Sequence, residues 1–304
     1  MKKALISFVA ILVSVFVLLS VLGAKDQYAA ERALWKINQR FSKVSEDPKI
    51  FPNSVFDELA KDYRKFTLQF SQPALVAVAH IFEGRVALLK EDYTGARNKF
   101  NEVIKLYASM PNVAAEASAE IAHTYALEDN YDKALETYRT ILKDYPLTPI
   151  GLKIPILIVR FHQGRREVSL AQRAFKDAVI HYKVLIQENP DSGIELDALR
   201  LLAACYASHE QWDNAIDVFR GILLKFGGSS MLNPRIAKEI VTSINTIAVV
   251  KLKNYDMPAI IYDDFVAKYP QHPFNRVFQR IIASFKSLSE KQKKELLKNI
   301  DERS

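Results

Sequence analysis

The sequence predicts an all-α fold, a right-handed solenoid of about six helix-turn-helix pairs that follows an N-terminal membrane-spanning helix. Only 9 glycines and 12 prolines occur in 304 residues, which leaves few positions for tight turns between strands. Long runs of Ala, Leu, Lys and Glu favour helix. One arrangement of aromatic residues, alanine and proline also recurs along the chain. With 49% hydrophobic and 25% charged residues, the helices should enclose a packed core.

The chain opens on an apolar segment. Residues Ala4 to Ala24 carry no charge, and as a helix they would extend about 31 Å, close to the ~30 Å hydrocarbon layer of a bilayer. We therefore expect a membrane span at residues 4–24, within a signal anchor or signal peptide at residues 1–25. Cleavage near Gly23 would instead release the chain. No cysteine stands directly after the run, so a bacterial lipid anchor at this place is not available.

Basic residues flank this segment on both sides, with Lys2 and Lys3 before it and a larger number after it. A short basic tail is hard to translocate, whereas large domains cross a membrane largely regardless of charge. We therefore expect an extracytoplasmic chain, on the periplasmic side of the inner membrane if the cell is Gram-negative. Secretion to the periplasm after cleavage is one alternative, and a cytoplasm-facing assembly adaptor is another.

The recurring arrangement is clearest in the stretch "YDKALETYRTILKDYP", residues 131–146. Offsets of three and seven residues place its alanine and its second aromatic on one face of a helix. The alanine lets a second helix approach, the aromatics fill the space between the helices, and the proline ends the helix. The recurring positions are Tyr93, Ala96, Phe100; Tyr131, Ala134, Tyr138, Pro146; Phe175, Ala178, Tyr182, Pro190; Trp212, Ala215, Phe219; and Tyr255, Tyr262, Pro270.

A degenerate copy precedes these five at Phe56, Leu59 and Tyr63. Successive first aromatics lie 37, 38, 44, 37 and 43 residues apart, a period typical of stacked helix pairs. Pro258 stands where the last copy should have alanine, so that helix is expected to begin at about Asp256 or Met257, with the proline in its first turn.

These residues resemble the tetratricopeptide-repeat family. The second full copy has Ile121, Ala122 and Tyr125 at the positions of that family's Leu-Gly-x-x-Tyr signature, and Gly84 stands at the family's glycine position in the first copy. The loose periods look like the bacterial envelope type, similar to outer-membrane assembly lipoproteins but without the lipid-anchor cysteine. The first helix of the third copy departs from the frame, because "FHQGRREVSLAQRAF" carries several extra residues. The repeat array is expected at residues 26–272 and capping helices at residues 273–304.

The resemblance implies that the first helix of each pair lines a concave groove. In the family's frame, the candidate partner contacts in this groove are Arg85, Glu116, His123, Asp197 and Arg200.

Reactive chemistry is not indicated. The six histidines are scattered, "HEQWD" at His209 lacks the second histidine of a zinc motif, and the single Cys205 lies in an apolar helical pattern. We therefore predict no catalytic residue, no metal site and no cofactor.

The interleaved charges behind the net charge of +7 favour solvated helix faces over nucleic-acid binding. The sequence predicts a non-enzymatic, membrane-tethered scaffold that binds a protein or peptide partner in the cell envelope, with no small-molecule substrate. Envelope or outer-membrane assembly is the process in which we expect it to act. An envelope protein that binds or acts on glycan is the alternative from another functional class.

Overall fold

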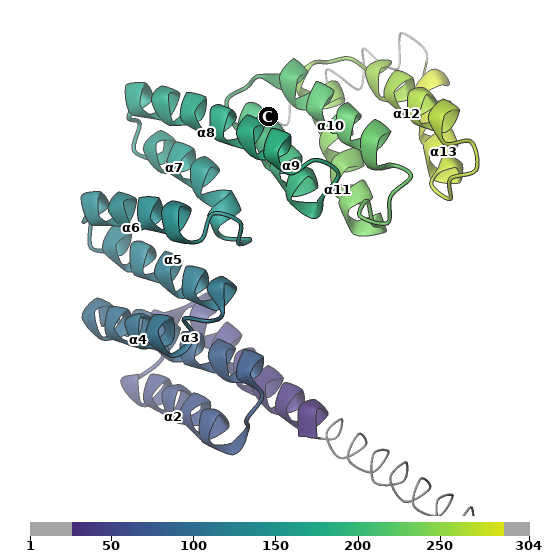
Figure 1. Ribbon diagram of the computed structural model, residues 1–304. Helices are drawn as coiled ribbons and strands as arrows, with labels where there is room; N and C mark the ends of the chain where they lie inside the picture. Colours follow the sequence, from purple (N-terminus) through teal and green to yellow (C-terminus); the bar gives the residue numbers. More distant parts are fainter. Residues whose placement is uncertain (1–25, 289–304) are drawn as a thin grey trace, which may run out of the picture. The chain divides into compact units, whose positions relative to one another are not determined.

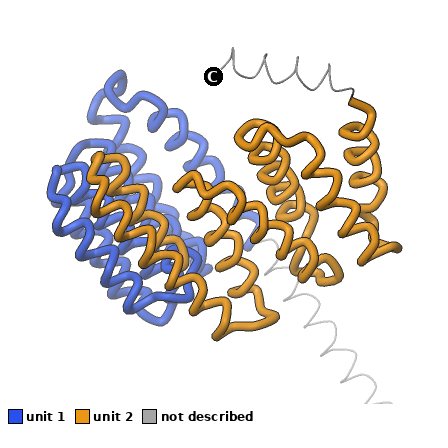
Figure 2. Tube along the Cα trace, turned by 90° about the horizontal axis from the view of Figure 1, so that it is seen from above, with its two compact units in different colours: residues 1–151 blue, residues 152–304 orange. Residues whose placement is uncertain are grey.

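The computed structural model describes residues 26–288, and every element in this range is a helix. The expectation of an all-α fold is confirmed. Residues 1–151 and 152–304 form two compact units, coloured blue and orange in Figure 2. Each unit is a series of antiparallel helices joined by short turns, as Figure 1 shows.

Unit 1 begins with a helix at residues 26–46 and a short 3₁₀ turn at Pro48–Ile50. Five α-helices follow, and each packs on the next along the chain. They are α2 (Asn53–Gln69), α3 (Pro73–Leu89), α4 (Tyr93–Leu106), α5 (Pro111–Leu127) and α6 (Tyr131–Asp144). In repeat terms, α3 and α5 are first helices, and α2, α4 and α6 are second helices.

Unit 2 begins within a 3₁₀ turn at Gly151–Lys153 and continues the same alternation. The first helices are α7, α9, α11 and α13, and the second helices are α8, α10 and α12. Their bounds are α7 (Ile154–Gly164), α8 (Val168–Glu188), α9 (Gly193–Ser208), α10 (Trp212–Phe226), α11 (Pro234–Asn245), α12 (Met257–Lys268) and α13 (Asn275–Lys286). A π-helical segment at Thr246–Lys251 extends α11, and there the amide of Leu252 donates to the carbonyl of Ile247.

The recurring residues form the core of both units, as the spacing predicted. The alanines at 96, 134, 178 and 215 are buried, and so are Phe100, Tyr182, Phe219 and Tyr262 at the second aromatic position. Only Tyr138 is half-buried at that position. Pro146, Pro190 and Pro270 each come directly after a C-terminal cap residue, so their role as helix ends is also confirmed.

Two departures from the repeat frame have simple geometric explanations. The extra residues of the third copy extend α8 at its start, so Phe175 lies seven residues after Val168 instead of opening the helix. Seven residues are close to two full turns, which keeps the buried face in register. In the last copy α12 begins at Met257, which places Pro258 in its first turn as expected.

The turns inside four pairs share one backbone geometry. A residue with φ between 57° and 59° follows the first helix, at Glu91, Asp129, Arg166 and Glu210. The next amide then reaches back to the carbonyl five residues earlier, for example Asp92 to Ala87 at 3.0 Å. This is the helix-ending motif that usually carries glycine at its left-handed residue. Here other residue types occupy the position, so each turn is strained.

Two expectations fall on residues outside the described range. These are the membrane span at residues 4–24 and the part of the capping region at residues 289–304. The part of the capping region that is described forms α13. Between residues 26 and 288, no helix combines the length and the apolar character that crossing a bilayer requires.

Gly84 on α3 is a sharp test of helix–helix packing, because a Cβ there would come within 2.4 Å of the Phe100 ring. We expect Gly84→Ala to lower the free energy of unfolding by about 1–3 kcal/mol, as overpacking does. Gly221→Ala in α10 is the control, since its added methyl group meets no atom within 4 Å, and it should be neutral or stabilise by up to about 1 kcal/mol. Urea denaturation measures both, and a double-mutant cycle with Phe100→Leu should show the two sites to be coupled. An unchanged midpoint for Gly84→Ala would contradict this packing.

The strained turns make an opposite prediction. Glu91→Gly should raise the free energy of unfolding by about 0.5–1 kcal/mol, because glycine adopts positive φ without the Cβ penalty. Lys61→Gly, at an exposed position inside α2, should instead lower it by about 1 kcal/mol. Thermal and urea denaturation of the two variants provide the comparison, and equal losses in both would show that the turn is not strained.

Candidate functional site

The residues expected to contact a partner all lie on first helices. Arg85 is on α3, Glu116 and His123 are on α5, and Asp197 and Arg200 are on α9. They belong to two ion-pair clusters, one in each unit. The Arg85 cluster comprises Arg85, Glu116, Glu120 and His123, and the Arg200 cluster comprises Asp197, Arg200 and Glu239.

In the Arg85 cluster one guanidinium bridges two carboxylates of the next first helix. Arg85 Nε donates to Glu120 Oε1 at 2.7 Å, and Nη2 donates to Glu116 Oε1 at 2.9 Å. The guanidinium carbon lies 4.9 Å from the centre of the Phe82 ring, which supports its flat face. The cluster therefore joins α3 to α5 and holds the arginine in one orientation.

Glu120 and His123 differ in exposure. Burial alone would raise the pKa of the Glu120 carboxyl, but its polar contacts with His123 and Arg85 outweigh burial and keep the pKa below its usual range. His123 Nδ1 lies 3.9 Å from Glu120 Oε2, and 57% of the histidine side chain is exposed. His123 is thus the member of the cluster most open to a partner.

In the Arg200 cluster a guanidinium again serves two carboxylates. Nη1 of Arg200 donates to Asp197 Oδ1 at 2.8 Å on the same helix, and Nη2 donates to Glu239 Oε2 on α11 at 2.6 Å. About half of each carboxylate side chain is exposed. Arg200 Nε is buried and has no hydrogen-bond partner among the described residues.

The two clusters share a charge surplus. Each pairs one arginine with two carboxylates, so each carries one net negative charge when histidine is neutral. Glu120 and Glu239 were missed by the sequence analysis, because their partners lie 35 and 39 residues away, in the neighbouring pair. No local motif connects residues at that distance, although the repeat period of about that length offered a signal.

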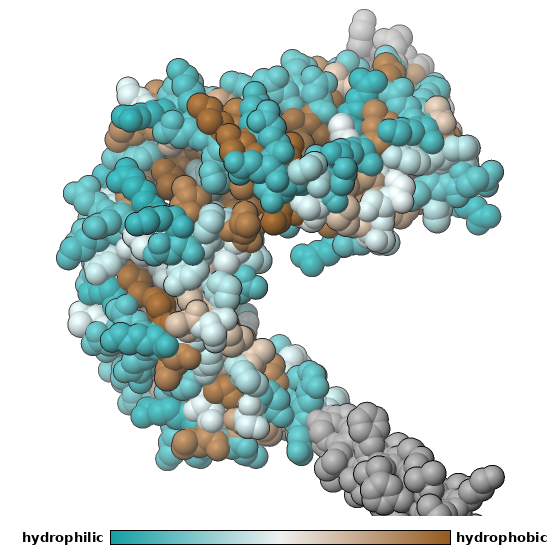
Figure 3. All heavy atoms as spheres, viewed as in Figure 1, coloured by the Kyte–Doolittle hydropathy of each residue, from teal (hydrophilic) through white to brown (hydrophobic). Residues whose placement is uncertain are grey.

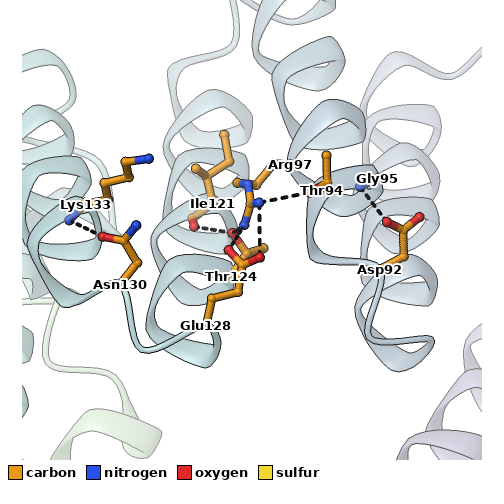
Figure 4. Close-up of polar contacts among 9 residues, drawn as sticks. All are labelled: Asp92, Thr94, Gly95, Arg97, Ile121, Thr124, Glu128, Asn130 and Lys133. Carbon is orange, nitrogen blue, oxygen red and sulfur yellow. Dashed lines mark hydrogen bonds and ion pairs between the residues drawn. The ribbon is translucent and has the colours of Figure 1, made fainter.

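A second polar network lies at the turn side of unit 1 and is shown in Figure 4. Asp92 and Asn130 accept hydrogen bonds from Gly95 and Lys133 and cap α4 and α6. Arg97 on α4 pairs with Glu128, next to the end of α5, and donates to Thr124 Oγ1 at 3.2 Å. This network joins α4 to α5 and caps the start of α6, and its charges compensate one another.

The ring of Tyr125 adds to this contact between repeats. The Arg97 guanidinium carbon lies 4.7 Å from the ring centre and Lys133 Nζ lies 5.4 Å from it. Cations so placed are attracted to the ring electrostatically. Tyr125 therefore fixes three helices rather than offering a site for a ligand.

The remaining candidates for chemistry are structural in the described part of the chain. The ring centre of His209 lies 4.0 Å from that of Phe175 in a stacked arrangement, and His209 is the C-terminal cap residue of α9. Burial raises the pKa of the Cys205 thiol to about 11, so the reactive thiolate is scarce at neutral pH. Within residues 26–288 no three His, Cys, Asp or Glu side chains gather as metal ligands would.

The described residues form no single dominant apolar patch on the face seen in Figure 3. On the face seen in Figure 3, hydrophilic residues cover most of both units, and the hydrophobic ones form separate patches. A surface cavity between α2, α3 and α4 is lined by charges that are already paired, Lys90 with Asp57 at 2.8 Å and Arg64 with Glu83 at 3.1 Å. Neither feature competes with the two arginine clusters as a recognition site.

Residues 121–148 match the family model described as Tetratricopeptide repeat, and they cover the end of α5, the strained turn and α6. This part of the chain is therefore a tetratricopeptide repeat. The resemblance drawn from Ala134, Tyr138 and Pro146 is thereby confirmed for the family. Repeats of this kind suggest a protein–protein interaction scaffold, and their fold is typically non-enzymatic.

Several solved structures match the chain at low sequence identity. BtubC from P. vanneervenii is 14% identical with a TM-score of 0.38, over 86% of this chain and 94% of that chain. The TPR2AB domain of yeast Sti1, solved in a complex with pHSP90, is 14% identical with a TM-score of 0.33, over 85% and 98%. A chain of the structure of Naa15/Naa10 bound to HypK-THB is 18% identical with a TM-score of 0.40, and the match covers 82% of this chain and 34% of that chain. No curated protein matches the sequence.

The Arg85 cluster makes a pH-dependent prediction. Because the pKa of Glu120 is lowered in the folded state, its charged form stabilises the fold above the ordinary carboxyl pKa, and this stabilisation is lost as pH falls below it. Arg85→Met should lower the free energy of unfolding at pH 7 by about 1–2 kcal/mol, and the deficit should shrink as the pH falls towards 3. Arg139→Met, at an exposed site on α6, is the control. Urea denaturation over a pH series checks this, and a deficit independent of pH would contradict it.

Proposed function

We propose that this repeat protein is a non-enzymatic scaffold, tethered to a membrane, that binds a protein or peptide partner in the cell envelope. The observation that carries the proposal is the position of the two arginine clusters on first helices. Both leave carboxylate groups at the surface after their internal pairing is complete. A basic segment of a partner would find acceptors at both places.

The chemistry of the clusters favours recognition over catalysis. A glycan-cleaving site needs one carboxyl group whose pKa is raised, so that it can protonate the leaving oxygen. The pKa of Glu120 is shifted in the opposite direction, and in each cluster one arginine pairs with both carboxylates. Peptide recognition needs only fixed charges and hydrogen-bond acceptors, which both clusters supply.

The membrane and envelope parts of the proposal rest on the sequence. The uncharged run at residues 4–24 is long enough to cross a bilayer, and Lys2 and Lys3 precede it. We place the repeats outside the cytoplasm, because large domains cross a membrane largely regardless of their charge. A partner would then be met close to the membrane, in the setting of envelope or outer-membrane assembly.

Site-directed photo-cross-linking of the full chain in its own cells tests the proposal. A photoreactive amino acid placed at His123, beside the Arg85 cluster, should yield one discrete cross-linked protein. The same group at Arg139, on the second helix α6, should not. Adding Glu116→Lys to the variant that carries the photoreactive group at His123 should reduce the yield of the cross-linked product by about tenfold. Loss of one charged contact worth about 1.4 kcal/mol has an effect of this size.

The identity of the cross-linked protein decides the remaining part. A partner with an extracytoplasmic domain supports the envelope placement, whereas a purely cytoplasmic partner contradicts it. Equal labelling from His123 and Arg139 would show that the first helices are not the recognition face.

A further inference from the structure

The first helix of unit 1, residues 26–46, has an exposed face of unusual composition. Spacings of four, three, one, three and four residues place six exposed side chains on one side of this helix. We call them the aromatic–basic stripe, and they are Tyr28, Arg32, Trp35, Lys36, Gln39 and Lys43. Tyr28 is 66% exposed and Trp35 is 60% exposed, large values for aromatic side chains.

The opposite face of this helix is fully used in packing. Ala30, Leu34 and Val44 are buried against α2 and α3. Asn38 accepts a hydrogen bond from the hydroxyl of Tyr63 at 2.8 Å. The helix is the dark purple element of Figure 1, and these contacts fix which of its faces points outward.

The charges of the stripe are also not consumed inside the protein. Arg40, at the side of the stripe, pairs with Glu58 and Asp62 of α2. Within residues 26–288, by contrast, no ion pair engages Arg32, Lys36 or Lys43. Two acids of the helix lie near the stripe. Glu31, at its edge, accepts a hydrogen bond from Gln27 at 3.0 Å, and the exposed Glu46 follows Lys43 by three residues on the same face. The stripe therefore presents three positive charges.

Tyrosine and tryptophan together with long basic side chains suit one environment in particular. Their apolar bodies enter the boundary of a bilayer, while the hydroxyl, indole N–H and cationic groups stay at the level of the phosphates. A helix face that combines Lys and Arg with tryptophan binds anionic lipid in two ways, through the apolar area that it buries and through electrostatic attraction to the headgroups. The stripe also begins at Tyr28, only four residues after the uncharged run that ends at Ala24.

We propose that the aromatic–basic stripe docks on the headgroup surface of an anionic bilayer. This inference rests on the membrane tether of the proposed function, and it adds that the first helix reads the charge of the lipid. A second copy of the chain fits the stripe less well, because self-pairing would bring three positive charges against three. One helix face is also narrow compared with the ~800 Å² that each partner buries in a stable protein interface.

Tryptophan fluorescence of the full chain in vesicles tests the inference. The chain has 2 tryptophans, so Trp212→Phe leaves Trp35 as the reporter. Vesicles of phosphatidylcholine alone are compared with vesicles of about three parts phosphatidylcholine to one part phosphatidylglycerol. We expect a blue-shifted emission and at least about twofold stronger quenching by brominated lipid in the anionic vesicles, and salt should weaken both.

Matched charge reversals separate recognition from mere proximity. Arg32→Glu with Lys36→Glu should abolish the difference between the two vesicles. Lys61→Glu with Lys65→Glu, at exposed positions of α2, should leave it intact. Equal access of acrylamide to Trp35 in both kinds of vesicle would overturn the proposal, and so would a blue shift that depends on protein concentration without lipid, which indicates a second copy.

The outcome is independent of partner binding. Lipid-dependent quenching at Trp35 without any cross-link at His123 would support the stripe and remove the proposed partner. The reverse result would support the partner and remove the stripe.

Discussion

Close approach between neighbouring helices is the constraint on which the rest of the structure depends. Where the Phe100 ring lies against Gly84, no room remains even for one methyl group. Buried alanines play the same part in the other pairs, at Ala134, Ala178 and Ala215. Close-packed interiors respond to single methylene groups, so these positions tolerate little variation. Specificity is left to the side chains that point away from the neighbouring helix.

The turns between paired helices are fixed by backbone hydrogen bonds. An amide after the turn returns to the carbonyl five residues earlier, as Asn130 does to Tyr125 at 2.8 Å. The hydrogen bonds satisfy backbone groups that a helix end leaves open. Because Asp129 and Arg166 adopt positive φ without being glycines, the pairs keep one geometry at some cost in strain. The same turn then places each second helix alongside its first helix.

Much of this architecture could be predicted from the sequence, because it follows from local spacing. The alanine and aromatic offsets identified the buried faces, and the position of Pro258 fixed the start of α12. The left-handed turn residues gave no signal, since nothing in their residue type distinguishes them. The partners of Arg85 and Arg200 were equally hidden, because Glu120 and Glu239 come from the next repeat. In the third copy the frame failed because two turns were added to α8 rather than to its connection.

The sharing of one arginine by two carboxylates has a consequence for binding. A lone exposed carboxylate keeps its full hydration shell, and a partner must remove it at some cost. Arg85 and Arg200 already hold and orient the acids beside them, so a partner's cation meets preorganised acceptors and loses less freedom on binding. Each exposed contact is still weak. The proposed binding therefore needs several such contacts, and a repeat array adds contacts one repeat at a time. Affinity then depends on the number of repeats engaged rather than on the strength of any one cluster.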